Sequence, residues 1–183
     1  MTDTLAPDAD LSLFDKSDFT REQAGALINE ALAGADDGEL YLEYAQSESL
    51  TFDNGRLKGA SFNTDHGFGL RADAGEAAGY AHSGELSLAA LRRAADAVQA
   101  VKAGHQGQYA AAPPRTNRQL YTNANPIGEP SFEAKVSLLQ QIDAYARAKD
   151  PRVRQVSASL AASWQVVEIL RSDGHYVRDV RPM

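Results

Sequence analysis

The chain contains no cysteine, and this absence excludes several kinds of chemistry. None of its 183 residues can form a disulfide, act as a thiolate nucleophile or bind zinc through sulfur. No run of about 18 or more apolar residues is present to cross a membrane. The acidic first residues also lack the basic start and apolar centre of a secretory signal. We therefore expect a soluble, unexported protein with no membrane partner, and the lack of cysteine is compatible with a reducing cytoplasm.

Basic residues are scarce at the front of the chain and scattered elsewhere. The net charge is −7, and residues 1–48 hold 12 of the 25 acidic residues but only 2 of the 18 basic ones. A nucleic-acid-binding protein needs a clustered basic stripe to neutralise phosphates. Here Arg56, Lys58 and Arg71 are interleaved with acidic residues. We therefore predict no direct nucleic-acid partner.

Residues 1–18 are predicted to form an acidic mobile tail. They hold five aspartates around a short apolar cluster that includes Leu13 and Phe14, and they show no helix or strand period. A segment of this composition cannot build a core element by itself. We expect the tail to remain mobile except where this cluster docks on the following domain.

Residues 19–104 have the pattern of a two-layer α+β domain: a helix, an antiparallel β-meander and a second helix. The first helix begins after Thr20, which stands at capping-box spacing from Gln23, and its apolar residues recur at helical intervals as far as Gly34. Ser87 caps the second helix, which has one apolar side and extends to Gly104.

Between these two helices, apolar and polar residues alternate as is typical of half-buried strands. Residues 53–55 are Asp-Asn-Gly, a turn sequence suited to positive φ. A second turn is expected at residues 65–67, which are Asp-His-Gly, and a third at Gly75. The pattern predicts four or five antiparallel strands.

Residues 105–130 are rich in proline and glycine and are predicted to be a linker. Residues 131–183 then predict a helix that ends before Pro151, followed by one β-hairpin. A helix and a hairpin cannot bury both faces of a sheet, so this part is expected to be the truncated beginning of a second α+β domain. The residues expected on the buried side of the helix are Phe132, Val136, Leu139, Ile142, Tyr145 and Ala146.

Few residues of the chain have the type and spacing that suggest catalysis, metal binding or ligand binding. The four histidines are isolated, and none has the i, i+4 partner that a helical zinc site needs, so we assign no catalytic or metal-binding residue to this chain. Three residues remain as candidates for a substrate groove or a partner contact: Arg71, Tyr80 and His82. Each has a simpler alternative, since a solvated arginine, a rim tyrosine and a surface histidine are common on strands.

Two glycines precede the first of these candidates. Gly67-Phe68-Gly69 has the start of a phosphate-binding glycine loop but lacks the third glycine and the following helix. Glycines within a strand more often mark a close approach of backbone or ligand. We therefore predict a close approach here instead of a phosphate site.

Several stretches of the first domain together resemble the opening of the TldD/PmbA metalloprotease family, on its TldD side. The resemblance is dense over residues 35–104 and looser from residue 131 onward. The stretches that carry it are Gly-Glu-Leu-Tyr-Leu-Glu-Tyr at 38–44, Glu-Ser-Leu at 48–50, Phe-Asp-Asn-Gly-Arg-Leu-Lys at 52–58, Gly-Phe-Gly-Leu-Arg-Ala at 67–72, Gly-Tyr-Ala at 79–81 and Leu-Arg-Arg-Ala-Ala at 91–95.

The resemblance implies a cytoplasmic bacterial or archaeal metallopeptidase that uses zinc. It also implies a link to the maturation of microcin-like peptides and to modulation of DNA gyrase. In the family the zinc site lies on a later helix of the form His-Glu-x-x-x-His with a downstream cysteine, and neither part is present in residues 1–183. The chain by itself is therefore expected to be inactive, whereas the full-length protein would bind zinc.

Three functions stay open at this point. The meander can offer a strand edge to an extended or unfolded peptide, which would make this region part of a substrate cleft. Alternatively, the region is a dimerisation scaffold that binds a second copy or a homologous TldD/PmbA-type subunit. The third alternative is a free-standing protein-interaction module without enzymatic activity.

Overall fold

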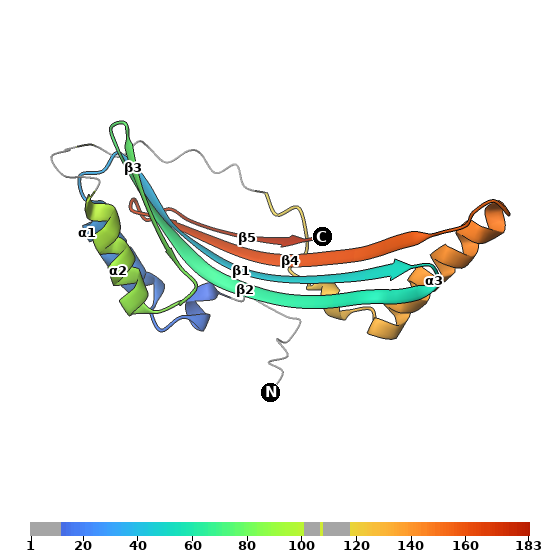
Figure 1. The fold of residues 1–183 in the computed structure, drawn as a ribbon. Helices are drawn as coiled ribbons and strands as arrows, with labels where there is room; N and C mark the ends of the chain where they lie inside the picture. Colours follow the sequence, from blue (N-terminus) through green and yellow to red (C-terminus); the bar gives the residue numbers. More distant parts are fainter. Residues whose placement is uncertain (1–11, 101–106, 108–117) are drawn as a thin grey trace.

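The computed structural model describes residues 12–100, 107 and 118–183 (Figure 1). Within them, a five-stranded antiparallel sheet and three α-helices form the α+β fold that the sequence predicts. The sheet has the order β3-β2-β1-β4-β5. Its strands are β1 (Asp37–Asp53), β2 (Arg56–Ala74), β3 (Ala77–Ser83), β4 (Ser157–Arg171) and β5 (Tyr176–Pro182). The helices are η1 (Leu13–Lys16), α1 (Arg21–Leu32), α2 (Leu88–Gln99), η3 (Pro126–Gly128) and α3 (Phe132–Lys149).

The helix starts follow the capping residues found in the sequence. Thr20 and Gln23 form the capping box: Thr20 Oγ1 accepts the Gln23 N–H at 3.2 Å, and Gln23 Oε1 accepts the Thr20 N–H at 2.8 Å. Ser87 and Ser131 each accept one N–H from the first turn of α2 and α3. Residues 101–104, the predicted end of the second helix, lie outside the described residues.

The meander has three strands, not the four or five that alternation predicts. The turn at residues 53–55 is confirmed, with positive φ at Asn54 (52°) and Gly55 (79°). The turn expected at residues 65–67 is wrong, because β2 continues through them without a break. β1 is 17 residues long and pairs with β2 through this point, so ladder hydrogen bonds outweigh the local turn preference of Asp-His-Gly.

The second hairpin extends the sheet formed by the first one. β1 pairs with β2 on one side and, from Glu39 to Asp53, with β4 on the other. The hairpin of β4 and β5 therefore gains a third strand from the front of the chain, as the adjoining ribbons show (Figure 1). The domain boundaries that we predicted remain predictions, and residues 105, 106 and 108–117 of the linker fall outside the described residues.

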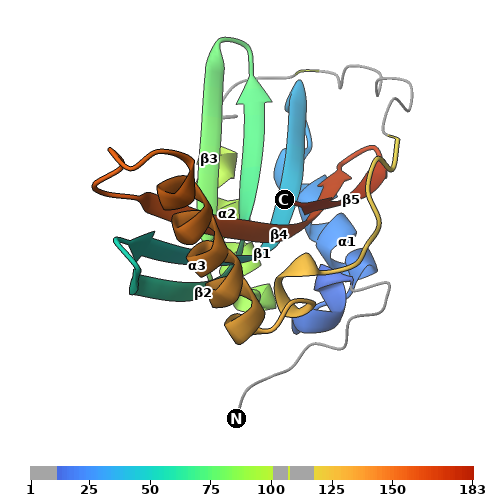
Figure 2. The same ribbon diagram turned by 90° about the vertical axis from the view of Figure 1, so that its right-hand side faces the viewer.

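All three α-helices lie on one face of the sheet, at its two ends (Figure 1, Figure 2). Strand side chains alternate between faces, and the even-numbered residues of β1 point to the helices. Leu40 and Leu42, both fully buried, belong to the main core with α1 and α2. At the other end, Leu50 and Phe52 form a small separate cluster with Leu139 of α3.

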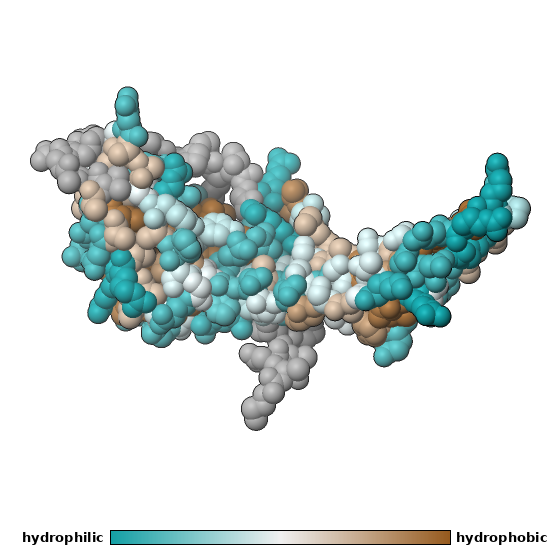
Figure 3. Space-filling view, in the orientation of Figure 1, coloured by the Kyte–Doolittle hydropathy of each residue, from teal (hydrophilic) through white to brown (hydrophobic). Residues whose placement is uncertain are grey.

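The buried side of α3 differs from the predicted one. Leu139 faces the sheet as expected, but Phe132, Ile142 and Tyr145 are 45%, 42% and 65% exposed, so their predicted burial is wrong. The helix instead buries Lys135, whose Nζ pairs with Glu48 of β1 and donates to the Ile127 carbonyl at 2.6 Å. Figure 3 accordingly shows apolar surface around the start of α3.

The N-terminal segment is docked from residue 12 onward. Leu13, Phe14 and Phe19 are 0%, 8% and 2% exposed and belong to the main core, which confirms that the apolar cluster docks. The segment is fixed to β4 by Glu168, a fully buried carboxylate that accepts the Leu13 N–H at 3.0 Å. Residues 1–11 of the predicted tail lie outside the described residues.

Glu168 is expected to make stability depend on pH. Desolvation raises its pKa above the ordinary value, although hydrogen bonds from Leu13, Tyr176 and Ser12 and the charge of Arg178 oppose the shift. A raised folded-state pKa adds stability that is complete below the unfolded pKa and is lost as pH rises through the folded value.

The difference in unfolding free energy between wild type and Glu168→Gln should therefore fall as pH rises from 4 to 8. Urea titrations across this range measure that difference. A constant difference at every pH would contradict the prediction.

Candidate functional site

Two glycines of β2 allow β3 residues to approach closely on the sheet face opposite the helices. A Cβ atom on Gly69 would lie 2.5 Å from the Tyr80 hydroxyl oxygen, and one on Gly67 would lie 2.6 Å from the Ser83 carbonyl oxygen. The Tyr80 ring occupies space that any larger residue at position 69 would fill. The predicted close approach at these glycines is thus present, and it comes from β3.

The strand register places side chains along both sides of these glycines. Tyr41, Gly69 and His82 form one row across β1, β2 and β3, and Glu43 stands beside Gly67 in the next row. A shallow cavity of about 290 Å³ lies here. We call it the glycine trench, and six of its lining residues matter below: Tyr41, Glu43, Asp65, Gly67, Tyr80 and His82.

The trench carries negative charge. The Tyr41 hydroxyl donates to Glu43 Oε2 at 2.6 Å. Burial, together with this bond to Glu43, raises the pKa of Tyr41 to about 12, so the phenol stays protonated and remains a donor at neutral pH. Within the described part of the chain, neither Glu43 nor Asp65 forms an ion pair.

Two of the three candidate residues meet in the trench. The Tyr80 ring, 67% exposed, stacks on His82 with centroids 5.7 Å apart and an interplanar angle of 26°. Arg71 is the cross-strand neighbour of Tyr80 but does not line the cavity, and it pairs with Asp73 at 3.0 Å. Sequence reasoning missed Tyr41 and Glu43, whose contribution depends on the register between β1 and β2.

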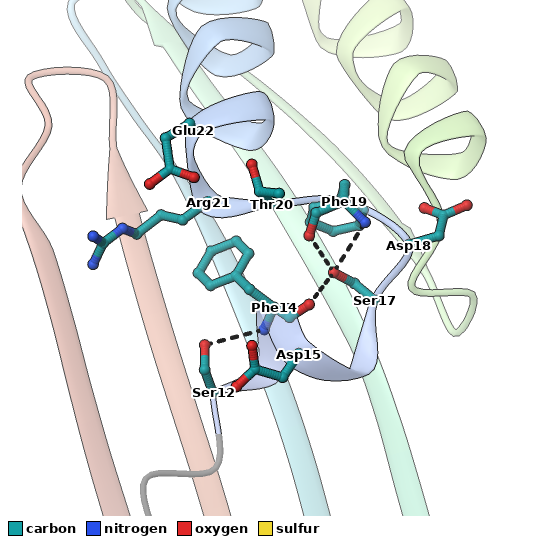
Figure 4. A pocket seen from close by; sticks show the side chains of 9 residues that line it. All are labelled: Ser12, Phe14, Asp15, Ser17, Asp18, Phe19, Thr20, Arg21 and Glu22. Carbon is teal, nitrogen blue, oxygen red and sulfur yellow. Dashed lines mark hydrogen bonds between the residues drawn. The ribbon is translucent and has the colours of Figure 1, made fainter.

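A second hollow lies beside the docked N-terminal segment and has a volume of about 480 Å³ (Figure 4). Ser12 and Ser17 beside it form hydrogen bonds with nearby backbone groups. Ser17 Oγ accepts the Phe19 N–H at 3.3 Å and lies 2.8 Å from the Phe14 carbonyl oxygen. Asp18 accepts the Leu88 N–H at the start of α2. These contacts give the hollow a structural role in joining η1, α1 and α2.

The described residues do not fit a metal centre. No group of three or more histidine, aspartate or glutamate side chains comes together among them. Within the same residues, no helix combines the length and apolarity needed to cross a membrane. Among the described residues, the trench is the hollow that contains two of the three candidate residues, Tyr80 and His82.

Comparison with known proteins identifies the family. Residues 38–103 match the model described as PmbA/TldA metallopeptidase domain 1, and residues 125–183 match that of the PmbA/TldA metallopeptidase central domain. The Metalloprotease TldD homolog of Haemophilus influenzae is 36% identical over 152 residues, and that of Buchnera aphidicola subsp. Acyrthosiphon pisum is 33% identical over 148 residues. The matches cover 81% and 80% of this chain but 31% of each relative.

Solved structures share the fold at low sequence identity. TldE from Thermococcus kodakarensis superposes with a TM-score of 0.64 at 15% identity, over 86% of this chain and 37% of TldE. A candidate modulator of DNA gyrase from Bacteroides thetaiotaomicron gives a TM-score of 0.67 at 14% identity, over 91% of this chain and 39% of that protein. The two family models together match more than half of the chain, in the order in which the domains are named. The chain therefore belongs to the PmbA/TldD metallopeptidase family and corresponds to its N-terminal portion.

Proposed function

We propose that this chain forms a substrate-cleft and scaffold portion of a TldD-like, zinc-dependent metallopeptidase that acts on unfolded or extended peptides. The names of the Haemophilus and Buchnera relatives support a metalloprotease. Zinc would bind outside the described residues, and the chain by itself would not hydrolyse peptides. The protein would work in the cytoplasm, in a dimer with itself or with a homologous subunit. We extend the proposal to two processes: the maturation of microcin-like peptides and the modulation of DNA gyrase.

One observation carries the peptide-binding part of the proposal: β2 is longer than its outer partner. β1 pairs with β2 from Arg56 to Asp73, whereas β3 pairs with it only from Phe68 to Ala74. Residues 56–67, which we call the β2 edge, have no strand on their outer side in the described part of the chain. Unpaired backbone N–H and C=O groups of this kind accept an additional strand.

The ladder geometry identifies the free groups. The Asn54 N–H donates to the Val156 carbonyl at 2.8 Å, which places the backbone groups of even-numbered β1 residues toward β4 and those of odd-numbered ones toward β2. The register pairs the odd residues 41–51 of β1 with odd residues 59–69 of β2. The backbone groups that point outward therefore belong to Ala60, Phe62, Thr64 and His66.

An extended peptide would bind the β2 edge mainly through its main chain. Such pairing tolerates many sequences, as an enzyme for unfolded segments requires. Phe62 and Leu57 are 56% and 36% exposed, so they offer apolar contacts to peptide side chains. The β2 edge would thus supply most of the affinity, and these two side chains would bias the choice of peptide.

Replacing Thr64 by proline tests this proposal. Proline removes one outward N–H and obstructs strand addition, but an edge strand tolerates it when that N–H faces solvent. Binding of a dye-labelled hexapeptide, Ala-Val-Ser-Val-Ala-Ser, should weaken about tenfold by fluorescence anisotropy, a loss of about 1.4 kcal/mol. In the whole protein, cleavage of the same peptide should slow in parallel.

Thr64→Val is the matched control, because it keeps the N–H and the β-branched shape. Its peptide affinity should stay within about twofold of wild type, a difference of less than about 0.5 kcal/mol. Equal binding by the proline variant, with an unchanged circular dichroism spectrum, would refute peptide binding at the β2 edge.

The alternative is a non-enzymatic dimerisation or protein-interaction module. The outer side of α3 favours it, since Leu138, Ile142 and Tyr145 are exposed at helical spacing. Binding of the labelled hexapeptide distinguishes the two functions, because self-association is compatible with both. A chain that self-associates in sedimentation velocity but does not bind the hexapeptide supports the non-enzymatic module.

A further inference from the structure

Two tyrosine side chains line the glycine trench. Tyr41 stands on the β1 side and Tyr80 on the β3 side, and the two glycines of β2 between them carry no side chain. The Tyr80 ring lies over Gly69, and a small group in the cavity can contact both phenol rings. Aromatic rings in such a position attract cations through the negative charge of their faces.

Charge within the trench favours the same kind of ligand. Glu43 uses Oε2 to accept the Tyr41 hydroxyl hydrogen, which leaves Oε1 available to a ligand. Asp65 adds a second carboxylate at the same cavity. Both lack a basic partner among the described residues. A carboxylate beside an aromatic wall forms a strong charge-assisted hydrogen bond with an ammonium or guanidinium group.

The nearby arginines do not neutralise the trench. Arg71 is next to Tyr80 in register, but it pairs with Asp73 at 3.0 Å and lies outside the cavity. Arg181 of β5 is close enough to influence Tyr41, and its Nε donates to Asp179 at 2.8 Å. Each arginine therefore has its own carboxylate, and the trench keeps the charge of Glu43 and Asp65.

We propose that the glycine trench binds a single cationic group, an ammonium or guanidinium, between Tyr41 and Tyr80 with Glu43 as its counter-ion. This site lies on the sheet face opposite the helices and shares Asp65 and Gly67 with the β2 edge. Peptide addition would instead use the outward backbone groups of the even-numbered residues of that edge. The cation can come from a lysine or arginine side chain of a peptide or from a free small amine. Both sources present the same chemistry to the trench.

Titration of the ¹⁵N-labelled chain with three small probes tests the proposal. Methylguanidinium represents the free cation, N-acetyl-arginine methylamide the peptide side chain, and N-acetyl-citrulline methylamide its neutral counterpart. The amide resonances of Gly67 and Gly69 should shift and saturate with either cation and should not respond to the citrulline probe. Tighter binding of the arginine probe than of methylguanidinium would assign the peptide source, and equal binding would assign the free amine.

Glu43→Gln should weaken binding of the arginine probe about tenfold, which equals about 1.4 kcal/mol. Glutamine keeps an oxygen for the Tyr41 hydroxyl, so the wall stays in place. Glu133→Gln is the matched control, an exposed acid on α3, and should bind like wild type. Tyr80→Ala should also weaken binding, through loss of one wall.

The proposal is overturned if Gly67 and Gly69 do not shift with either cation, or if the citrulline probe binds equally well. Unchanged affinity in Glu43→Gln also overturns it. Thr64→Pro serves to separate the two proposals, since it should weaken hexapeptide binding at the β2 edge about tenfold and leave binding of methylguanidinium unchanged.

Discussion

Replacing Glu168 by alanine is expected to lower the free energy of unfolding by about 3 to 5 kcal/mol. The carboxylate is fully buried, accepts the Leu13 N–H at 3.0 Å and lies 3.7 Å from Arg178 Nε. It also accepts a hydrogen bond from Tyr176. Alanine would leave these donors unsatisfied inside the protein and open a cavity between η1 and β4.

We expect most of this loss of unfolding free energy to come from release of the N-terminal segment. Without Glu168, Leu13 has no acceptor for its N–H, and the burial of Phe14 against Phe19 and Tyr176 is no longer held in place. Urea unfolding followed by circular dichroism at pH 7 measures the change. Increased proteolysis before residue 20 at low urea would show that release of this segment precedes global unfolding.

Two control variants separate the charge from the packing. Glu168→Gln keeps the shape and one acceptor oxygen, so it should cost only about 1 to 2 kcal/mol. Glu30→Ala, at an exposed position of α1, should change the free energy of unfolding by less than about 0.5 kcal/mol. If Glu168→Ala were as mild as Glu30→Ala, Glu168 would have no part in holding the segment.

Local signals predict the parts of this fold that depend on neighbouring residues. The capping box at Thr20, the caps at Ser87 and Ser131 and the turn at Asn54 all follow from side-chain chemistry within a few residues. The uninterrupted course of β2 through residues 65–67 does not, because the deciding hydrogen bonds come from β1. No local pattern predicts the pairing of β1 with β4 either, because the two strands are far apart in the sequence.

The residues of the candidate site also divide into those that the sequence places and those that only strand pairing places. Tyr80 and His82 alternate on one strand, so the sequence places them on one face, and the structure brings both to the trench. Tyr41 and Glu43 join them because of the pairing Tyr41↔Gly69 and Glu43↔Gly67. A shift of one residue in that register would turn both toward the helices. The two-residue turn alone would pair Asp53 with Arg56 and Tyr41 with Phe68, but a β-bulge between Thr51 and Phe52 shifts the register by one residue. No local pattern predicts this bulge.

The buried side of α3 could not be predicted because polar contacts determine it. Helical spacing groups Ile142 and Tyr145 with Leu139, but only Leu139 is buried. Lys135 turns toward the sheet to pair with Glu48, and Asp143 is buried beside Arg147, whose Nε donates to it at 2.9 Å. These pairs compete with the apolar residues for the side that faces β1 and β4.

Leu139→Ala is therefore expected to be the most damaging single change in α3, costing about 2 to 4 kcal/mol. Leu139 is 1% exposed and packs with Leu50 and Phe52 in a cluster separate from the main core. With so few apolar partners, this end of the sheet has little other burial to hold the helix. The loss should appear first as detachment of α3, while α1 and α2 remain packed.

Leu138→Ala is the matched control for this prediction, because Leu138 is the preceding residue and is 46% exposed. It should cost less than about 1 kcal/mol. Hydrogen exchange distinguishes the two variants: the amides of α3 should lose protection in Leu139→Ala alone, and those of α2 should keep it in both. Equal loss of protection in the two variants would mean that α3 is held by its outer apolar side. The helix would then be oriented as its apolar spacing predicts, and the Lys135–Glu48 pair would not determine its buried side.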